Sequence, residues 1–166
     1  MNSIYNNGHL QGHQEIERKW LIRRLPESSL GEPLEILQGY IAVTPNGNEV
    51  RLRMKGGRYF LTVKTSGNQV RGETEIELQR DEFEVLWPAT EGARLHKNRY
   101  NLRYRGFTIE VDIYAETLSG LVIAEVEFGS EQEAAAFEPP EWFGEELTMD
   151  NRYKNKNLAM YGCPKE

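Results

Sequence analysis

From Glu15 to about Phe128 the chain alternates apolar and polar residues, a pattern typical of β-strands with one buried face. The connections between these stretches are short and carry turn residues such as Gly56 and Gly57, which favours antiparallel neighbours. The alternation predicts strands near residues 15–23, 35–43, 48–55, 58–65, 71–79, 96–104, 106–114 and 120–128.

Helical spacing interrupts the alternation at a few places. Helices are expected at 28–30, 80–87, 130–137 and 155–161, the third with Ser130 as its N-cap. Many strands with few helices predict an α+β fold: an eight-stranded antiparallel β-barrel, closed or nearly closed, with its helices packed outside. Residues 15–166 are expected to form this single domain, after a flexible arm at 1–14.

The polar face of almost every predicted strand is ionic. Between residues 49 and 55, for example, every odd position is charged and every even position is apolar. For one strand, charges that keep an outer surface soluble are the simpler explanation. The pattern recurs in nearly every strand, however, and a barrel of about eight strands has an interior. We therefore predict that the ionic faces meet in a hydrated bore built for a charged guest.

The basic side chains of these strands are typical of a site for linked phosphates, because Arg offers a planar fork and Lys a compact charge. Six are available: Lys19, Arg51, Arg53, Lys64, Lys97 and Arg99. Carboxylates beside phosphate imply a hard divalent cation, usually Mg²⁺ or Mn²⁺. Residues two apart on a strand lie about 6.6 Å apart on one face. Hence Glu15 with Glu17, or Glu125 with Glu127, can hold one ion or a pair of ions.

Overall charge and cysteine content indicate which partners and which cellular compartment suit this protein. The 26 acidic and 20 basic residues give a net charge of −6, which disfavours nucleic acid as a partner. A single cysteine, Cys163, suits a reducing compartment. Neither a membrane-length apolar run nor an export signal is visible, so we expect a cytoplasmic protein that does not bind membranes. Apolar outer faces leave room for a homodimer.

The charged motifs follow one another in a definite order. Glu15-Ile16-Glu17-Arg18-Lys19 comes first, and the later motifs are Arg51-Leu52-Arg53, Thr62-Val63-Lys64, Glu75-Ile76-Glu77, Lys97-Asn98-Arg99-Tyr100, Glu110-Val111-Asp112, Glu125-Val126-Glu127-Phe128 and Asp150 to Asn155. A Glu-x-Glu-x-Lys run alone is a weak pattern. The ordered series over residues 15–159, in contrast, resembles the CYTH domain family, the triphosphate tunnel metalloenzymes, in its small bacterial members.

This resemblance implies an antiparallel tunnel that binds a linear triphosphate, and it implies a role for each charged residue. The substrate ligands would be Lys19, Arg51, Arg53, Lys64, Lys97, Arg99 and Arg152. For Arg152 there is an alternative explanation, an exposed charge beside a helix. The ligands of two Mg²⁺ or Mn²⁺ ions would be Glu15, Glu17, Glu125 and Glu127. An ionic network inside the tunnel would comprise Glu75, Glu77, Glu110 and Asp112.

The expected chemistry is phosphoryl transfer to water, in which fixed cations and metal ions neutralise charge that develops on the phosphate oxygens. Lys19 would be a catalytic residue, and Glu125 or Glu127 would accept the proton of the attacking water. We expect inorganic tripolyphosphate to be the substrate. Class IV adenylate cyclase, thiamine triphosphatase and nucleoside triphosphatase activities remain open, as does a non-catalytic polyphosphate-binding module. A lipocalin-like carrier would need an apolar lumen, which the alternation argues against.

Overall fold

The structure is a computed structural model that describes residues 16–26, 30–65 and 72–165. One antiparallel sheet has its strands in the order β1-β8-β7-β6-β2-β3-β4-β5. Each predicted strand is confirmed, with bounds that differ by a few residues. Their bounds are β1 (Ile16–Leu21), β2 (Leu34–Val43), β3 (Glu49–Lys55), β4 (Arg58–Thr65), β5 (Gly72–Leu78), β6 (Arg94–Tyr104), β7 (Phe107–Tyr114) and β8 (Val122–Phe128).

The helices are short. They are α1 (Arg80–Leu86), η1 (Trp87–Thr90), η2 (Glu116–Leu118), α2 (Glu131–Ala136), η3 (Asn151–Tyr153) and α3 (Asn155–Tyr161). The Ser130 hydroxyl accepts a hydrogen bond from the backbone N–H of Glu133, as predicted for the cap of α2. In the described part of the chain, no helix has the length and apolar character needed to cross a membrane. The predicted arm at 1–14 and most of the predicted short helix at 28–30 lie outside the described residues.

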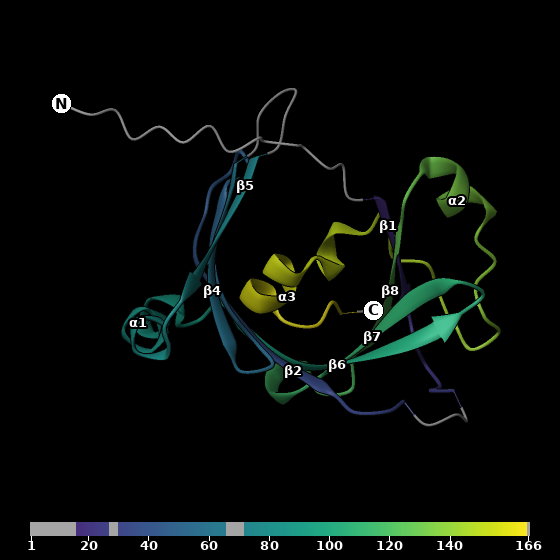
Figure 1. The fold of residues 1–166 in the computed structure, drawn as a ribbon, viewed down its shortest axis with the longest axis horizontal. Helices are drawn as coiled ribbons and strands as arrows, with labels where there is room; N and C mark the ends of the chain where they lie inside the picture. The colour runs from purple at the N-terminus through teal and green to yellow at the C-terminus, as the bar shows by residue number, and fades with distance from the viewer. Residues whose placement is uncertain (1–15, 27–29, 66–71, 166) are drawn as a thin grey trace.

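The sheet is strongly curved, so that β3, β4 and β5 form one wall and β1, β8 and β7 face them, with β2 and β6 between (Figure 1). Among the described residues β1 and β5 are not paired with each other, so a closed barrel is not confirmed. The free edge of β1 is paired with the segment 144–147 instead. The backbone N–H of Leu21 donates to the Glu145 carbonyl and that of Leu147 to the Lys19 carbonyl, both at 2.8 Å. This segment therefore occupies the edge that β5 would need to close the sheet.

Two apolar clusters lie on the outer face of the sheet. One contains Trp20, Val126 and Phe137 and lies under α2. The other contains Leu52 of β3 and Phe83 of α1. Both clusters use the apolar set of the alternating strands, so the charged set of the same strands faces inward.

Helix α3 lies inside the curve of the sheet (Figure 1). Its Leu158 is buried with Leu95, Tyr114 and Ile123, which belong to the inner face of β6, β7 and β8. The prediction of outside helices is thus correct for α1 and α2 and wrong for α3. The physical reason is that the inner face is apolar at one end: along β8, Ile123 precedes the inward-facing Glu125. An apolar helix face is buried there, next to the ionic part of the bore.

Candidate active site

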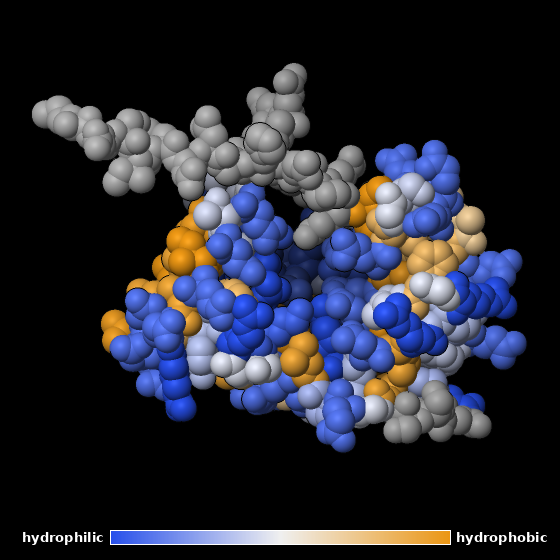
Figure 2. Space-filling model, viewed as in Figure 1, coloured by the Kyte–Doolittle hydropathy of each residue, from blue (hydrophilic) through white to orange (hydrophobic). Residues whose placement is uncertain are grey.

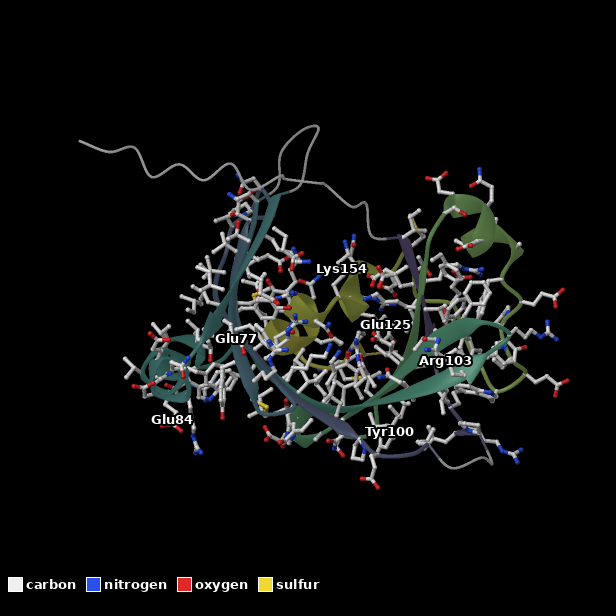
Figure 3. The ribbon with its side chains drawn as sticks, viewed as in Figure 1. Glu77, Glu84, Tyr100, Arg103, Glu125 and Lys154 are labelled. Carbon is white, nitrogen blue, oxygen red and sulfur yellow. The ribbon has the colours of Figure 1, made fainter. Side chains whose placement is uncertain are left out.

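The register of the strands brings the predicted charges onto the inner face. Lys19 of β1 is directly opposite Glu125 of β8, and Arg99 of β6 is directly opposite Asp112 of β7. Directly opposite residues in an antiparallel pair share a face. Figure 2 shows a hollow lined by hydrophilic residues, and Figure 3 shows Glu125 between the two walls while Glu84 lies on the outside, on α1. The ionic faces therefore do meet in a common bore.

A buried ionic network occupies the wall formed by β1, β8, β7 and β6. Asp112 is fully buried and accepts from Lys97 Nζ at 2.5 Å, from Arg99 Nε at 2.6 Å and from Arg99 Nη2 at 2.6 Å. Glu125 accepts from Arg99 Nη2 at 2.8 Å and from Lys19 Nζ at 2.7 Å. Glu110 adds a further carboxylate on Arg99. Each buried charge in this network has a partner, as burial of charge requires.

The direction of the pKa shift differs among the cations of this network. Burial would lower the pKa of Lys19, but Glu125 and Glu17 outweigh it and raise the pKa. Burial would likewise lower the pKa of Arg99, but Asp112 and its neighbours raise it. For Lys97, burial wins over Asp112 and lowers the pKa. An anion near Lys97 would therefore stabilise its charged form.

The opposite wall offers hydrogen-bond donors without acceptors. Arg53 Nη2 donates to Glu75 at 2.9 Å, and Arg51 Nη2 lies 3.5 Å from Glu73. The Nε atoms of both arginines are buried, and neither has a hydrogen-bond partner among the described residues. Burial and the charge of Arg51 lower the pKa of Arg53 by more than Glu75 raises it. Buried donors without acceptors are rare in folded proteins, so they mark a place where an anionic ligand fits.

The family is decided by comparison with known sequences. The sequence model of the CYTH domain matches residues 13–158. The chain belongs to the CYTH family. It is 48% identical to an inorganic triphosphatase of Nitrosomonas europaea over 88% of this chain and 97% of that protein. An inorganic triphosphatase of Acetivibrio thermocellus is 39% identical over 88% of this chain and 93% of the relative.

A solved CYTH relative has the same fold. The crystal structure of the inorganic triphosphatase NE1496 is similar to this chain with a TM-score of 0.73 and 46% identity. The match covers 92% of this chain and 97% of that chain. The fold of the curved sheet is thus one that this chain shares with that solved structure.

Lys64 and Glu77, predicted as a substrate ligand and a network residue, form ion pairs that are at least partly exposed. Lys64 Nζ lies 2.9 Å from Glu73 on the neighbouring strand, and Glu77 lies 2.8 Å from Arg58 with both side chains exposed. These pairs are open to solvent, so they contribute little to stability and can exchange partners when a ligand arrives.

The carboxylates predicted to bind metal are only partly brought together. Glu17 and Glu127 are directly opposite each other, with Glu17 Oε1 3.2 Å from Lys19 Nζ. Both oxygens of Glu125 accept from cations, and Glu15 lies outside the described residues. Within the described ranges, no three ligand-type side chains gather into a metal site. The chemistry of the Glu17 and Glu127 pair suits a hard divalent cation, which would need further oxygen ligands.

Arg152 is not brought together with the other predicted substrate ligands. Its guanidinium pairs with Asp150 at 2.7 Å. It lines a pocket with Arg23, Glu145 and the C-terminal Lys165, none of which is a predicted site residue. The alternative explanation of Arg152, an exposed charge beside a helix, agrees with this position.

Tyr40 lies in the bore but is not among the site residues predicted from the sequence. Tyr40 is buried, directly opposite Arg51, and its hydroxyl accepts from Gln38 Nε2 at 2.7 Å. Burial raises the pKa of Tyr40 to about 12. The alternation of β2 does put Gln38 and Tyr40 on the same face, but neither carries a charge, so the pattern of ionic residues gives no signal for them.

Proposed function

We propose that this CYTH protein is a metal-dependent hydrolase of linear triphosphates, with inorganic tripolyphosphate as its substrate. The observation that carries the proposal is the pair of buried Nε donors of Arg51 and Arg53, which have no hydrogen-bond partner among the described residues, in a bore whose other wall holds the buried network of Lys97 and Arg99. Guanidinium donors fit phosphate oxygens. The names of the relatives from Nitrosomonas europaea and Acetivibrio thermocellus support the same substrate.

Arg53 and Lys97, the two cations with lowered pKa, are contacts that we propose for the substrate, with Lys97 buried in its pair with Asp112 before the substrate binds. Arg53 and Lys97 belong to strands on either side of β2, so a phosphate chain lying across β2 would reach both. The negative charge of the substrate would offset the charge repulsion and the burial that lower these pKa values. Lys19, Arg51, Lys64 and Arg99 would complete the cradle.

We also propose that Glu17 and Glu127, together with Glu15 and Glu125, hold Mg²⁺ or Mn²⁺. A bound divalent cation would neutralise phosphate charge and lower the pKa of a bound water. For proton transfer, the two carboxylates predicted from the sequence differ in availability. Glu125 is engaged by Lys19 and Arg99, whereas Glu127 has an exposed side chain and no ion pair with a described residue. Glu127 is therefore the group that we assign to accept the proton of the attacking water.

A phosphate-release assay over tripolyphosphate, ATP and thiamine triphosphate tests the proposal. With Mg²⁺ or Mn²⁺, kcat/KM for tripolyphosphate should exceed that for either organic substrate by at least about tenfold. EDTA should abolish release. The variant Arg105→Met, which changes an exposed ion pair with Glu138, should behave like the wild-type protein. Cyclic AMP as the main product from ATP would favour the cyclase, and tight binding without turnover under any metal would favour the binding module.

A further inference from the structure

The first turn of α3 connects the two walls of the bore. Asn155 Oδ1 accepts from the Tyr114 hydroxyl of β7 at 2.8 Å, and Lys156 Nζ donates to Glu49 Oε1 of β3 at 2.9 Å. In the sheet, β6 and β2 separate β7 from β3. Two consecutive residues of α3 thus contact strands that are three positions apart. Such a link is useful in a sheet whose edges are not paired with each other.

Glu49 occupies a sensitive position on β3. It is directly opposite Lys64 of β4 and lies two residues before Arg51 on the same face. Directly opposite side chains have their Cβ atoms about 5 Å apart. Arg51 and Lys64 both lie close to the Glu73 carboxylate, at 3.5 and 2.9 Å. An unneutralised Glu49 carboxylate would add a second negative charge beside these two cations and would repel an incoming triphosphate.

Lys156 neutralises the Glu49 charge in the structure. Its ion pair with Glu49 is largely sheltered from solvent, with side-chain exposures of 22% for Lys156 and 14% for Glu49. Salt and water screen such a pair less than they screen an exposed one. The pair of Arg105 with Glu138, for comparison, has exposures of 63% and 79%. The Lys156 pair is thus built to hold the Glu49 carboxylate.

We propose that Lys156 is a positioning residue for triphosphate binding. By neutralising Glu49 it removes the effect of a second carboxylate charge beside Arg51 and Lys64, which already face Glu73. This inference rests on the proposed function, since it assumes that the bore binds tripolyphosphate. Lys156 follows the last residue of the closing charged motif, and neither that motif nor strand alternation assigns it a role.

A double-mutant cycle of Lys156→Met and Glu49→Gln tests the inference. Methionine keeps the length of the side chain and removes its charge, so Glu49 loses its partner. We expect Lys156→Met to raise both the KM and the metal-free Kd for tripolyphosphate by about tenfold, because a carboxylate is left unpaired beside the substrate. The turnover number should stay within about threefold of wild type. In the double variant, the Kd should return to within about threefold of that of Glu49→Gln.

The controls separate positioning from folding. Circular dichroism and thermal unfolding should show that each variant is folded, Lys156→Arg should bind like wild type, and Arg105→Met serves as the matched loss of an ion pair elsewhere. If the double variant binds tripolyphosphate as weakly as Lys156→Met does, the inference is overturned. Binding measured by calorimetry in EDTA tests the role of Lys156 even if no variant turns over the substrate. A lack of turnover would contradict only the proposed hydrolase activity. If the wild-type protein does not bind tripolyphosphate, both proposals fail.

Discussion

Replacing Asp112 with asparagine is expected to lower the free energy of unfolding by about 3–5 kcal/mol, because it leaves buried cations without their shared counter-charge. The Asp112 carboxylate is inaccessible to solvent and accepts hydrogen bonds from Lys97 and Arg99. An asparagine of the same shape keeps the packing but supplies no negative charge. Urea-induced unfolding at neutral pH, followed by circular dichroism, measures the change.

The control for this loss is Glu77→Gln. Glu77 also pairs with an arginine, Arg58, but both side chains are exposed, and exposed pairs contribute little to stability. Its unfolding midpoint should stay close to that of the wild-type protein. If Asp112→Asn unfolds at the same urea concentration as Glu77→Gln, the buried network does not stabilise the fold as we infer.

In contrast to Asp112→Asn, the variant Arg53→Met is expected to lose much of its activity and little of its stability. Its buried Nε has no partner among the described residues, and Glu75 would keep its hydrogen bond from the Thr62 hydroxyl. We therefore expect the free energy of unfolding to stay within about 1 kcal/mol of wild type. The value of kcat/KM for tripolyphosphate should fall about 100-fold to 1000-fold, the usual effect of removing a preorganised cation from a transition state.

Steady-state kinetics and urea unfolding of the same preparations check this separation. Arg53→Lys should recover only part of the activity, because lysine keeps the charge but lacks the planar fork. Unfolding of Arg53→Met at a much lower urea concentration would show that Arg53 holds the fold together. Unchanged kinetics would remove it from the substrate site.

The strands and their inward faces could be predicted because alternation is a local property. Between residues 49 and 55 it determines which side chains share a face, and the structure places Arg51 and Arg53 together on the inner one. The family could be predicted for a related reason. Its motifs are short runs on single strands, so they can be recognised without knowledge of how the strands meet.

The closure of the sheet and the place of α3 could not be predicted, because both depend on contacts between distant residues. The edge of β1 is occupied by residues 144–147, which carry no strand pattern. A helix of one or two turns shows an apolar stripe, but the stripe does not reveal which side of a sheet buries it. The Lys156 and Glu49 pair joins residues 107 positions apart in sequence.

Within the candidate site, charge was the signal that the sequence provided, and it has limits. It identified Lys97, Arg99 and Asp112, which form one network. It gave no sign of Tyr40, whose position follows from alternation alone. It also grouped Arg152 with the bore cations, although in the structure Arg152 pairs with Asp150.

A crystal structure with tripolyphosphate bound tests the central claim most directly, that the inward ionic faces form a triphosphate site. We predict phosphate oxygens within hydrogen-bond distance of the Nε atoms of Arg51 and Arg53, with the chain extending across β2 toward Lys97. Binding outside the bore, for example in the pocket lined by Arg23 and Arg152, with the Nε atoms still unpartnered, would contradict it.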